Sequence, residues 1–220
     1  WVLLFFVGNT PAASQIVVCF SQTNDPAAGW NLYTLPGNPL NNNRWSDFPS
    51  MAFTDDKLVM SINLIIPGVS WQVGFDGTVI WEMDKAAGYA GDTALPAELH
   101  HGIQYNGNWI RNLVAVNGWD GYVSKPMWAS NRNFSAQNDT MFFLRRADSA
   151  IGGTHSYHIY QVPTTLPYGV PPDARQPSSD PNNANYHLST NDGRWLGALE
   201  LSDGSVHVVS TTRDFTTNRC

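Results

Sequence analysis

Residues 51–64 read MAFTDDKLVMSINL, and they set the pattern by which the rest of the chain is interpreted. A short apolar run ends in Thr54-Asp55-Asp56, and a second run rich in apolar residues follows and finishes in Ser and Asn. Residues 197–212, GALELSDGSVHVVSTT, repeat this arrangement around Asp203-Gly204. Acidic turns between apolar runs are typical of β-hairpins. The sequence therefore predicts two similar antiparallel hairpins, widely separated along the chain.

Further strand signals continue along the whole sequence, whereas helical periodicity is nearly absent. Runs of β-branched and aromatic residues bounded by turn formers predict strands at 2–7, 15–21, 30–35, 50–53, 58–66, 70–75, 78–82, 109–116, 140–145, 156–162, 195–201 and 205–211. Asp76-Gly77 predicts one more hairpin turn. A short helical signal at 83–89 is too brief to count as a helix.

Repeated units of several strands each are typical of propeller blades. We therefore expect an all-β chain holding about three blades of a β-propeller, in a larger or incomplete ring. The expected divisions are a partial blade at 1–36, a blade at 48–84, a blade with a polar insertion at 99–163, a loop at 164–188 and a partial blade at 189–220. The insertion covers residues 117–138. Three blades do not close a ring, since propellers use four to eight, so other segments or other chains would complete it.

Charge argues against several classes of partner. Lys and Arg number 12 against 18 Asp and Glu, for a net charge of −6, and Arg145-Arg146 is the only basic cluster. Nucleic acid is therefore not an expected partner. No apolar run is long enough to span a bilayer.

Cys19 lies in an apolar run and is expected to be a buried thiol, although a Cys19–Cys220 disulfide stays open.

Two stretches carry a resemblance to a known group. The first is CFSQTNDPAAGWNLYTLPG followed by RWSDFPSMAFTDDKLVMSINL, and the second is PPDARQPSSDPNNANYHLSTNDGRWLGALELSDGSVHVVSTT. Together they resemble secreted bacterial β-propeller proteins of unassigned role. Residues 24–30 are also similar to a degenerate form of the Asp-box turn of sialidase-like propellers. The resemblance implies the fold and a secreted or cell-surface location, and it implies no catalytic site.

Tryptophan is the residue type that points to binding. The chain has nine tryptophans, and exposed indole rings flanked by polar groups commonly build sugar-binding surfaces. About two-thirds are expected to pack in the core. The polar insertion sets apart Trp119, Trp128, Tyr122 and Asp120, which are the expected ligand-binding residues.

Acid–base catalysis would need two carboxylates on one rim. Asp47 and Glu98 are the first candidates, and Asp84 and Asp192 are the second choice. A sialidase would also need clustered arginines, but Arg111, Arg145, Arg175 and Arg194 are scattered in the sequence. No Ser, Cys or Thr nucleophile motif is present.

Metal binding and cofactors are not expected. Adjacent His100 and His101 point to opposite faces of a strand, and His155 and His158 do the same. Asp180 and the asparagines at 182, 183 and 185 could supply oxygens to calcium, but such a run is more often solvated loop.

These observations predict an extracellular recognition or structural module without catalysis, binding a glycan or an extracellular protein. Two alternatives stay open. One is a glycoside hydrolase or lyase using Asp47 and Glu98, and the other is a subunit of a surface filament or larger assembly.

Overall fold

A computed structural model describes residues 1–121, 123–147, 157–175 and 186–220. The chain is all-β, with 52% strand and 5% helix. Its sheets are antiparallel apart from one short parallel pairing between β11 and β17, and none of them closes on itself. With so little helix to cover the sheets, the core has to form where sheets pack on one another.

The N-terminal half forms two sheets. The first has the order β1-β2-β3 and the second the order β4-β5-β6-β7. Their bounds are β1 Val2–Val7, β2 Gln15–Ser21, β3 Trp30–Pro36, β4 Trp45–Phe53, β5 Lys57–Ile65, β6 Phe75–Asp84 and β7 Ala97–His100. Two short helices interrupt the second sheet, α1 Trp71–Gly74 before β6 and α2 Lys85–Ala90 after it.

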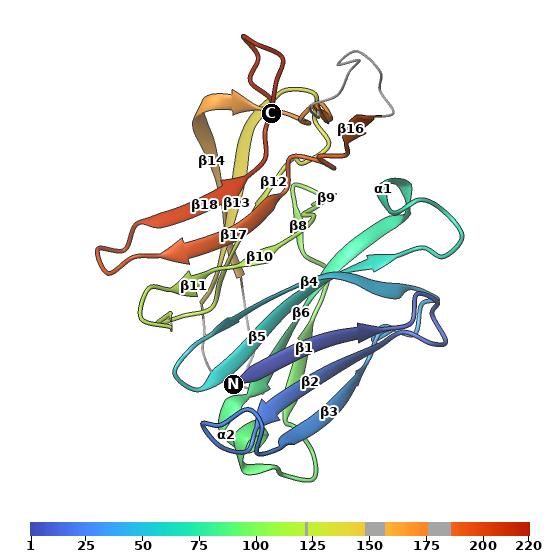
Figure 1. Cartoon of the computed structure of the whole chain (residues 1–220), viewed down its shortest axis with the longest axis vertical. Helices are drawn as coiled ribbons and strands as arrows, with labels where there is room; N and C mark the ends of the chain where they lie inside the picture. Colours follow the sequence, from blue (N-terminus) through green and yellow to red (C-terminus); the bar gives the residue numbers. More distant parts are fainter. Residues whose placement is uncertain (122, 148–156, 176–185) are drawn as a thin grey trace.

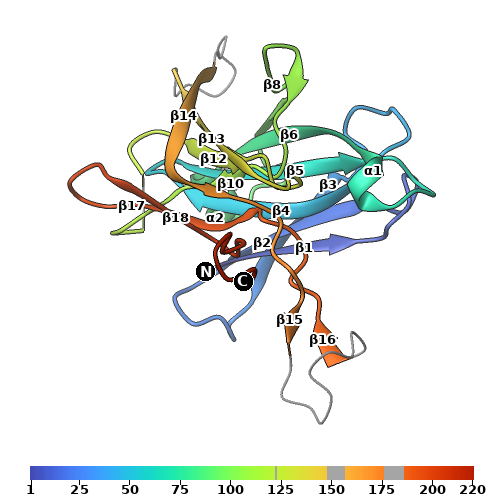
Figure 2. The ribbon, with the colours of Figure 1, turned by 90° about the horizontal axis from the view of Figure 1, so that it is seen from above.

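The C-terminal half forms two more sheets and two small hairpins. The third sheet has the order β10-β12-β13-β14 and the fourth the order β11-β17-β18, while β8 pairs with β9 and β15 with β16. Their bounds are β8 Gln104–Tyr105, β9 Asn108–Trp109, β10 Val114–Ala115, β11 Asn117–Gly118, β12 Met127–Asn131, β13 Asn138–Arg146, β14 Tyr157–Tyr168, β15 Ala174–Arg175, β16 His187–Leu188, β17 Trp195–Glu200 and β18 Val206–Ser210. The β15-β16 hairpin projects away from the body (Figure 2).

The four larger sheets lie in series, with the N-terminus at one end and the C-terminus at the other (Figure 1). Three clusters of buried apolar side chains fill the spaces between them. The first cluster joins the β1–β3 sheet to the β4–β7 sheet, the second joins β4–β7 to the third sheet, and the last joins the third sheet to β17 and β18. The two middle sheets are therefore covered on both faces.

Strand β5 demonstrates this double covering, because all nine of its residues are buried. Leu58, Met60 and Ile62 point into the first cluster, whereas Val59 points into the second. Ser61 faces the same way as Val59 and donates a hydrogen bond to the carbonyl of Leu113 at 2.6 Å. Alternate side chains thus join the second sheet to both of its neighbours.

The two hairpins that the repeat predicted are confirmed. The amide of Thr54 donates to the Lys57 carbonyl at 3.0 Å, and the amide of Leu201 donates to the Ser205 carbonyl at 2.8 Å. The strand predicted at 70–75 is wrong, because the chain leaves β5 through a turn at Gly68 and makes one helical turn over Trp71–Gly74.

The predicted Asp76-Gly77 turn is also wrong, because both residues lie inside β6. Asp76 forms an ion pair with Arg44 at 2.7 Å. Gly77 has a φ of 129° and lies against the ring of Trp109. A glycine in a strand interior marks such a close approach as readily as it marks a turn.

The predicted divisions differ from the sheets in position. The four-stranded β4–β7 sheet covers residues 45–100, and the third sheet covers 114–168. Residues 127–131, which we assigned to a polar insertion, form the buried strand β12. Strand β14 extends to Tyr168 and so occupies the beginning of the predicted loop. Both cysteines are free thiols, Cys19 buried and Cys220 exposed, so no bridge joins them.

Candidate functional site

An exposed tryptophan lies beside a groove at one end of the fourth sheet. Trp119 follows β11, and its amide donates to the carbonyl of Glu200 at 2.9 Å, which ties the loop to the end of β17. Gly121 closes the turn by donating to the Gly118 carbonyl at 3.0 Å. The Trp119 side chain is 70% exposed. The backbone is therefore fixed while the indole ring stays open to solvent.

The groove beside this ring has a volume of about 360 Å³. Besides Trp119 it is lined by two carboxylates, two hydroxyls, a leucine and a glycine, namely Glu200, Asp120, Ser124, Ser202, Leu201 and Gly204. None of the described residues that line it is basic. We call this surface the Trp119 groove. It combines an aromatic platform with hydrogen-bond acceptors and hydroxyls, as sugar-binding surfaces do.

The structure separates the other expected ligand-binding residues. Trp128, expected in a loop, lies in β12 with 0% exposure, and its ring packs at 5.8 Å and 73° to that of Tyr157. That prediction is wrong, because β12 is covered on both faces by neighbouring sheets. Asp120 lines the Trp119 groove, and Tyr122 lies outside the described residues. Glu200 and Ser202 were missed, because only the folded β17-β18 hairpin brings them to Trp119. Ser124 lies only five positions after Trp119 in the sequence and was not singled out.

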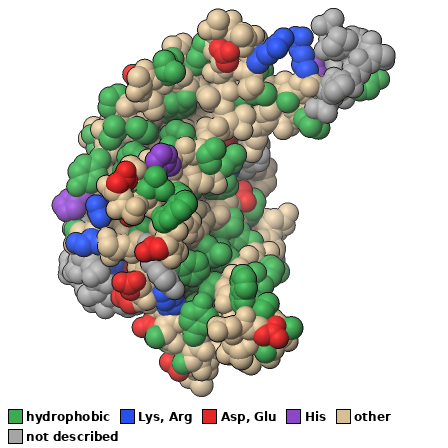
Figure 3. All heavy atoms as spheres, turned by 60° about the vertical axis from the view of Figure 1, so that its left-hand side comes forward, with side chains coloured by type: hydrophobic (Ala, Val, Ile, Leu, Met, Phe, Trp, Pro, Cys, Tyr) green, Lys and Arg blue, Asp and Glu red, His purple; other side chains and the backbone are tan. Residues whose placement is uncertain are grey.

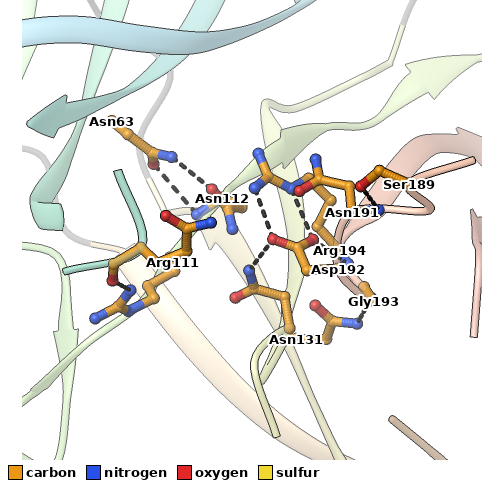
Figure 4. Close-up of polar contacts among 11 residues, drawn as sticks. Asn63, Arg111, Asn112, Asn131, Ser189, Asn191, Asp192, Gly193 and Arg194 are labelled. Carbon is orange, nitrogen blue, oxygen red and sulfur yellow. Dashed lines mark hydrogen bonds and ion pairs between the residues drawn. The ribbon is translucent and has the colours of Figure 1, made fainter. Parts of the chain in front are cut away.

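A second polar region lies at the opposite end of β17, where the second, third and fourth sheets meet. Asn63 of β5 donates to Asn112 at 2.5 Å (Figure 4). Asn63 also accepts from Thr78 at 3.1 Å. Thr78 also donates to the carbonyl of Ile110 at 2.9 Å. These bonds hold the segment before β10 against the second sheet.

Asp192 and Arg194 form a buried ion pair in the same region. The guanidinium donates to both carboxylate oxygens, at 2.8 and 2.6 Å (Figure 4). It also stacks at 4.5 Å over the ring of Phe48. Asn133 donates its side-chain NH₂ to Asp192 at 2.9 Å. Asp192 is thereby occupied as a structural partner, which does not suit a catalytic acid or base.

Arg111 and Arg132 lie beside this pair. The Arg111 guanidinium sits 4.4 Å from the centre of the Phe75 ring and 5.3 Å from that of Phe134. Both arginines line a pocket of about 260 Å³ together with Asn131, Asn133, Phe134 and Ser135. We call it the Arg111–Arg132 pocket. Arg111 and Arg194 also line one small cavity with Asp47, so the fold brings together two of the four scattered arginines.

Glu98, the second catalytic candidate, belongs to a buried ionic cluster. Its Oε2 atom lies 3.9 Å from Nε2 of His100. The same nitrogen lies 3.8 Å from Oε1 of the fully buried Glu82. Lys57 at 3.7 Å and Arg146 of the third sheet also pair with Glu82. This cluster links the second and third sheets.

Asp47 and Glu98 are too far apart to act as a pair. They lie on β4 and β7, the opposite edge strands of one sheet. Asp47 is paired with Asn63 of β5. Glu98 is paired with Glu82 of β6, which is paired in turn with Val59 of β5. Strand spacing and rise put them about 20 Å apart. Glycosidase carboxylates lie within about 10 Å of one another. The register therefore gives no support to a hydrolytic pair at these two residues.

The remaining candidates have structural or surface positions. Asp84 caps α2 by accepting from the amide of Ala87 at 2.8 Å. His101 is exposed next to the clustered His100. Within the described ranges, no three His, Cys, Asp or Glu side chains gather closely enough to hold a metal ion. His155 and the predicted calcium loop at 180–185 lie outside those ranges.

Basic and acidic side chains are interspersed on the face shown in Figure 3, where Lys and Arg do not form one large patch. In the part of the chain that the structure describes, no helix has both the length and the apolar character needed to cross a bilayer.

Searches against protein-family models, curated proteins and solved structures each gave no match to this chain.

Proposed function

We propose that this chain is an extracellular, non-catalytic recognition module whose Trp119 groove binds a glycan. The observation that carries the proposal is the exposed indole ring of Trp119, held by a tied backbone beside two carboxylates and two hydroxyls. An indole face covers the apolar face of a sugar ring, and carboxylates accept hydrogen bonds from its hydroxyls.

We further propose that the four stacked sheets are successive blades of a β-propeller. Support comes from the sheet order, because β4 to β7 pair in simple succession and each sheet packs mainly on the sheets next to it in the sequence. A sandwich would have two sheets and one core between them. Here three cores separate four sheets.

The chemistry of the groove favours a neutral glycan over an acidic one. Asp120 and Glu200 bring negative charge, and no Lys or Arg is found among the described residues that line the groove. The whole chain also carries a net charge of −6. A uronate or a sulfated sugar would therefore be repelled at this surface.

The test is binding to an array of neutral and acidic glycans, followed by titration of the strongest binder. Covering about 80 Å² of indole surface corresponds to about 2 kcal/mol, so Trp119→Ala should weaken binding about 30-fold. Glu200→Gln should weaken it as well. Tyr160→Ala is the matched control, because Tyr160 is an exposed aromatic residue on β14 outside the groove.

Retention of full affinity by Trp119→Ala would refute the groove as the binding site. Loss of binding in Tyr160→Ala to the same degree would show that the effect is not local. Absence of any glycan ligand, with the protein folded, would refute the glycan class.

A second candidate function, a subunit of a larger assembly, is favoured by the outer face of the first sheet. Leu3, Phe5 and Val7 alternate with the core residues of β1 and are exposed, and Leu32 of β3 is exposed on the same face. A further sheet from another chain would cover such a face. Native mass determination tests this candidate: a complex that Phe5→Ser dissociates supports it, and a monomer at high concentration refutes it.

A further inference from the structure

A second site lies at the other end of the fourth sheet from the Trp119 groove, and it has the opposite charge. Arg194 directly precedes β17 and Glu200 ends it, so the two regions are separated by the length of that strand, about 20 Å. The Arg111–Arg132 pocket contains two guanidinium groups, whereas the Trp119 groove contains two carboxylates.

Among the described residues, no carboxylate forms an ion pair with either arginine of this pocket. Among the described residues, the ion pairs within 4.0 Å involve Arg44, Lys57, His100, Arg146 and Arg194. Arg111 is fixed by its contacts with Phe75 and Phe134 and by a hydrogen bond from Nη1 to the Gln72 carbonyl at 3.3 Å. Arg132 stacks at 4.8 Å on the ring of Phe142. Aromatic rings hold both cations in place without neutralising them.

This arrangement disfavours the charged form of Arg111. Its burial, and then the charge of Arg132, lower the pKa of Arg111 below its ordinary value. A bound anion would relieve both effects, because it neutralises the pair and accepts the hydrogen bonds that burial takes from water.

The same pocket also contains a buried hydrogen-bond acceptor for which the described part of the chain supplies no donor. Asn133 is 1% exposed and lines the pocket, and its NH₂ group donates to Asp192. Its Oδ1 atom has no hydrogen-bond partner within the described ranges. A buried acceptor without a donor is costly, so a ligand that brings a hydroxyl would be favoured. A fully ionised sulfate has no proton to offer, whereas a hydroxy acid carries both a carboxylate and hydroxyls.

We propose that the Arg111–Arg132 pocket binds the carboxylate of an acidic sugar, a hexuronate, with Asn133 Oδ1 accepting a hydrogen bond from a hydroxyl of the same sugar. The pocket volume of about 260 Å³ lies below the range of about 300–1,000 Å³ for drug-sized ligands and suits one sugar residue. This proposal does not depend on the Trp119 groove, whose acidic lining disfavours the same ligand.

The experiment is calorimetric or NMR titration of the whole chain with sodium D-glucuronate, with D-glucose, acetate and sulfate in parallel. Glucuronate should bind, glucose should not, and acetate and sulfate should bind at least tenfold more weakly than glucuronate. Arg132→Gln should weaken glucuronate binding about 10- to 100-fold, as expected for the loss of a charged hydrogen bond. Arg145→Gln is the matched control, because Arg145 lies on β13 and does not line the pocket.

Several results would overturn the proposal. These are no heat or shift change with glucuronate at about 50 mM, equal binding of glucose, or sulfate binding as tightly as glucuronate. Tighter binding of N-acetyl-aspartate would indicate a protein carboxylate as the ligand and would also overturn it. If Arg132→Gln fails to fold by circular dichroism, Arg132→Lys replaces it and should keep the charge but lose at least fivefold in affinity. Unchanged affinity in Trp119→Ala keeps this result separate from the glycan groove.

Discussion

Replacing Trp128 or Trp119 by alanine makes the same chemical change in two opposite environments. Trp128 is fully buried, whereas Trp119 is 70% exposed. A buried tryptophan removes about 150–250 Å² from water, which corresponds to about 4–6 kcal/mol at about 25 cal/mol/Å². The buried indole N–H of Trp128 has no acceptor among the described residues, so its replacement sacrifices packing and no hydrogen bond.

We therefore expect Trp128→Ala to lower the free energy of unfolding by about 4 kcal/mol and the Tm by about 10 °C. Trp119→Ala should change it by less than about 0.5 kcal/mol. Thermal unfolding by circular dichroism and guanidinium titration measure both variants. Equal Tm values for the two variants would refute the placement of β12 between two cores, and so would a large loss in Trp119→Ala.

Three further predictions follow from buried groups. Asp192→Asn removes the carboxylate that pairs with buried Arg194 and should destabilise the chain by about 3 kcal/mol in guanidinium titration; an unchanged midpoint would argue against the pair. A thiol reagent should modify Cys220 in the native state and Cys19 only after unfolding, because Cys19 is buried; two fast-reacting thiols would contradict the position of β2. Burial raises the pKa of Tyr157 above its ordinary value. The contribution of the neutral phenol to the free energy of unfolding should therefore be complete below pH ~10 and should decrease as the pH rises further. When unfolding is followed against pH, Tyr157→Phe should show a smaller decrease than the parent.

Local sequence predicted most strands, and the errors share one cause. Residues 127–131 contain no regular alternation of apolar and polar side chains, so they resembled the polar segment around them. Alternation is expected only where one face of a strand meets water. Strand β12 is covered on both faces, and its burial depends on sheets that lie elsewhere in the sequence. The helical turn at Trp71–Gly74 likewise reflects the path between β5 and β6 rather than local propensity.

The candidate sites were predictable only in part. Trp119 was selected because it lies in the predicted polar insertion, and it is exposed; the same reasoning selected Trp128, which is buried. Arg111 and Arg132 are 21 positions apart, and no local signal connects them. They meet because the Ser130 hydroxyl donates to the carbonyl of Arg111, which places the end of β12 beside the segment before β10.

The two proposed sites should act independently, because strand β17 separates them. Sites about 20 Å apart with no shared side chains contribute additively within about 0.5 kcal/mol. A Trp119→Ala and Arg132→Gln double variant should therefore show each single variant's loss for its own ligand and no more. An acidic polysaccharide could bind far more tightly than either sugar alone, and each single substitution could abolish that gain in affinity. In that case the two sites contact one polysaccharide molecule. Additive losses would instead mean two separate ligands, the outcome that the opposite charges of the two linings favour.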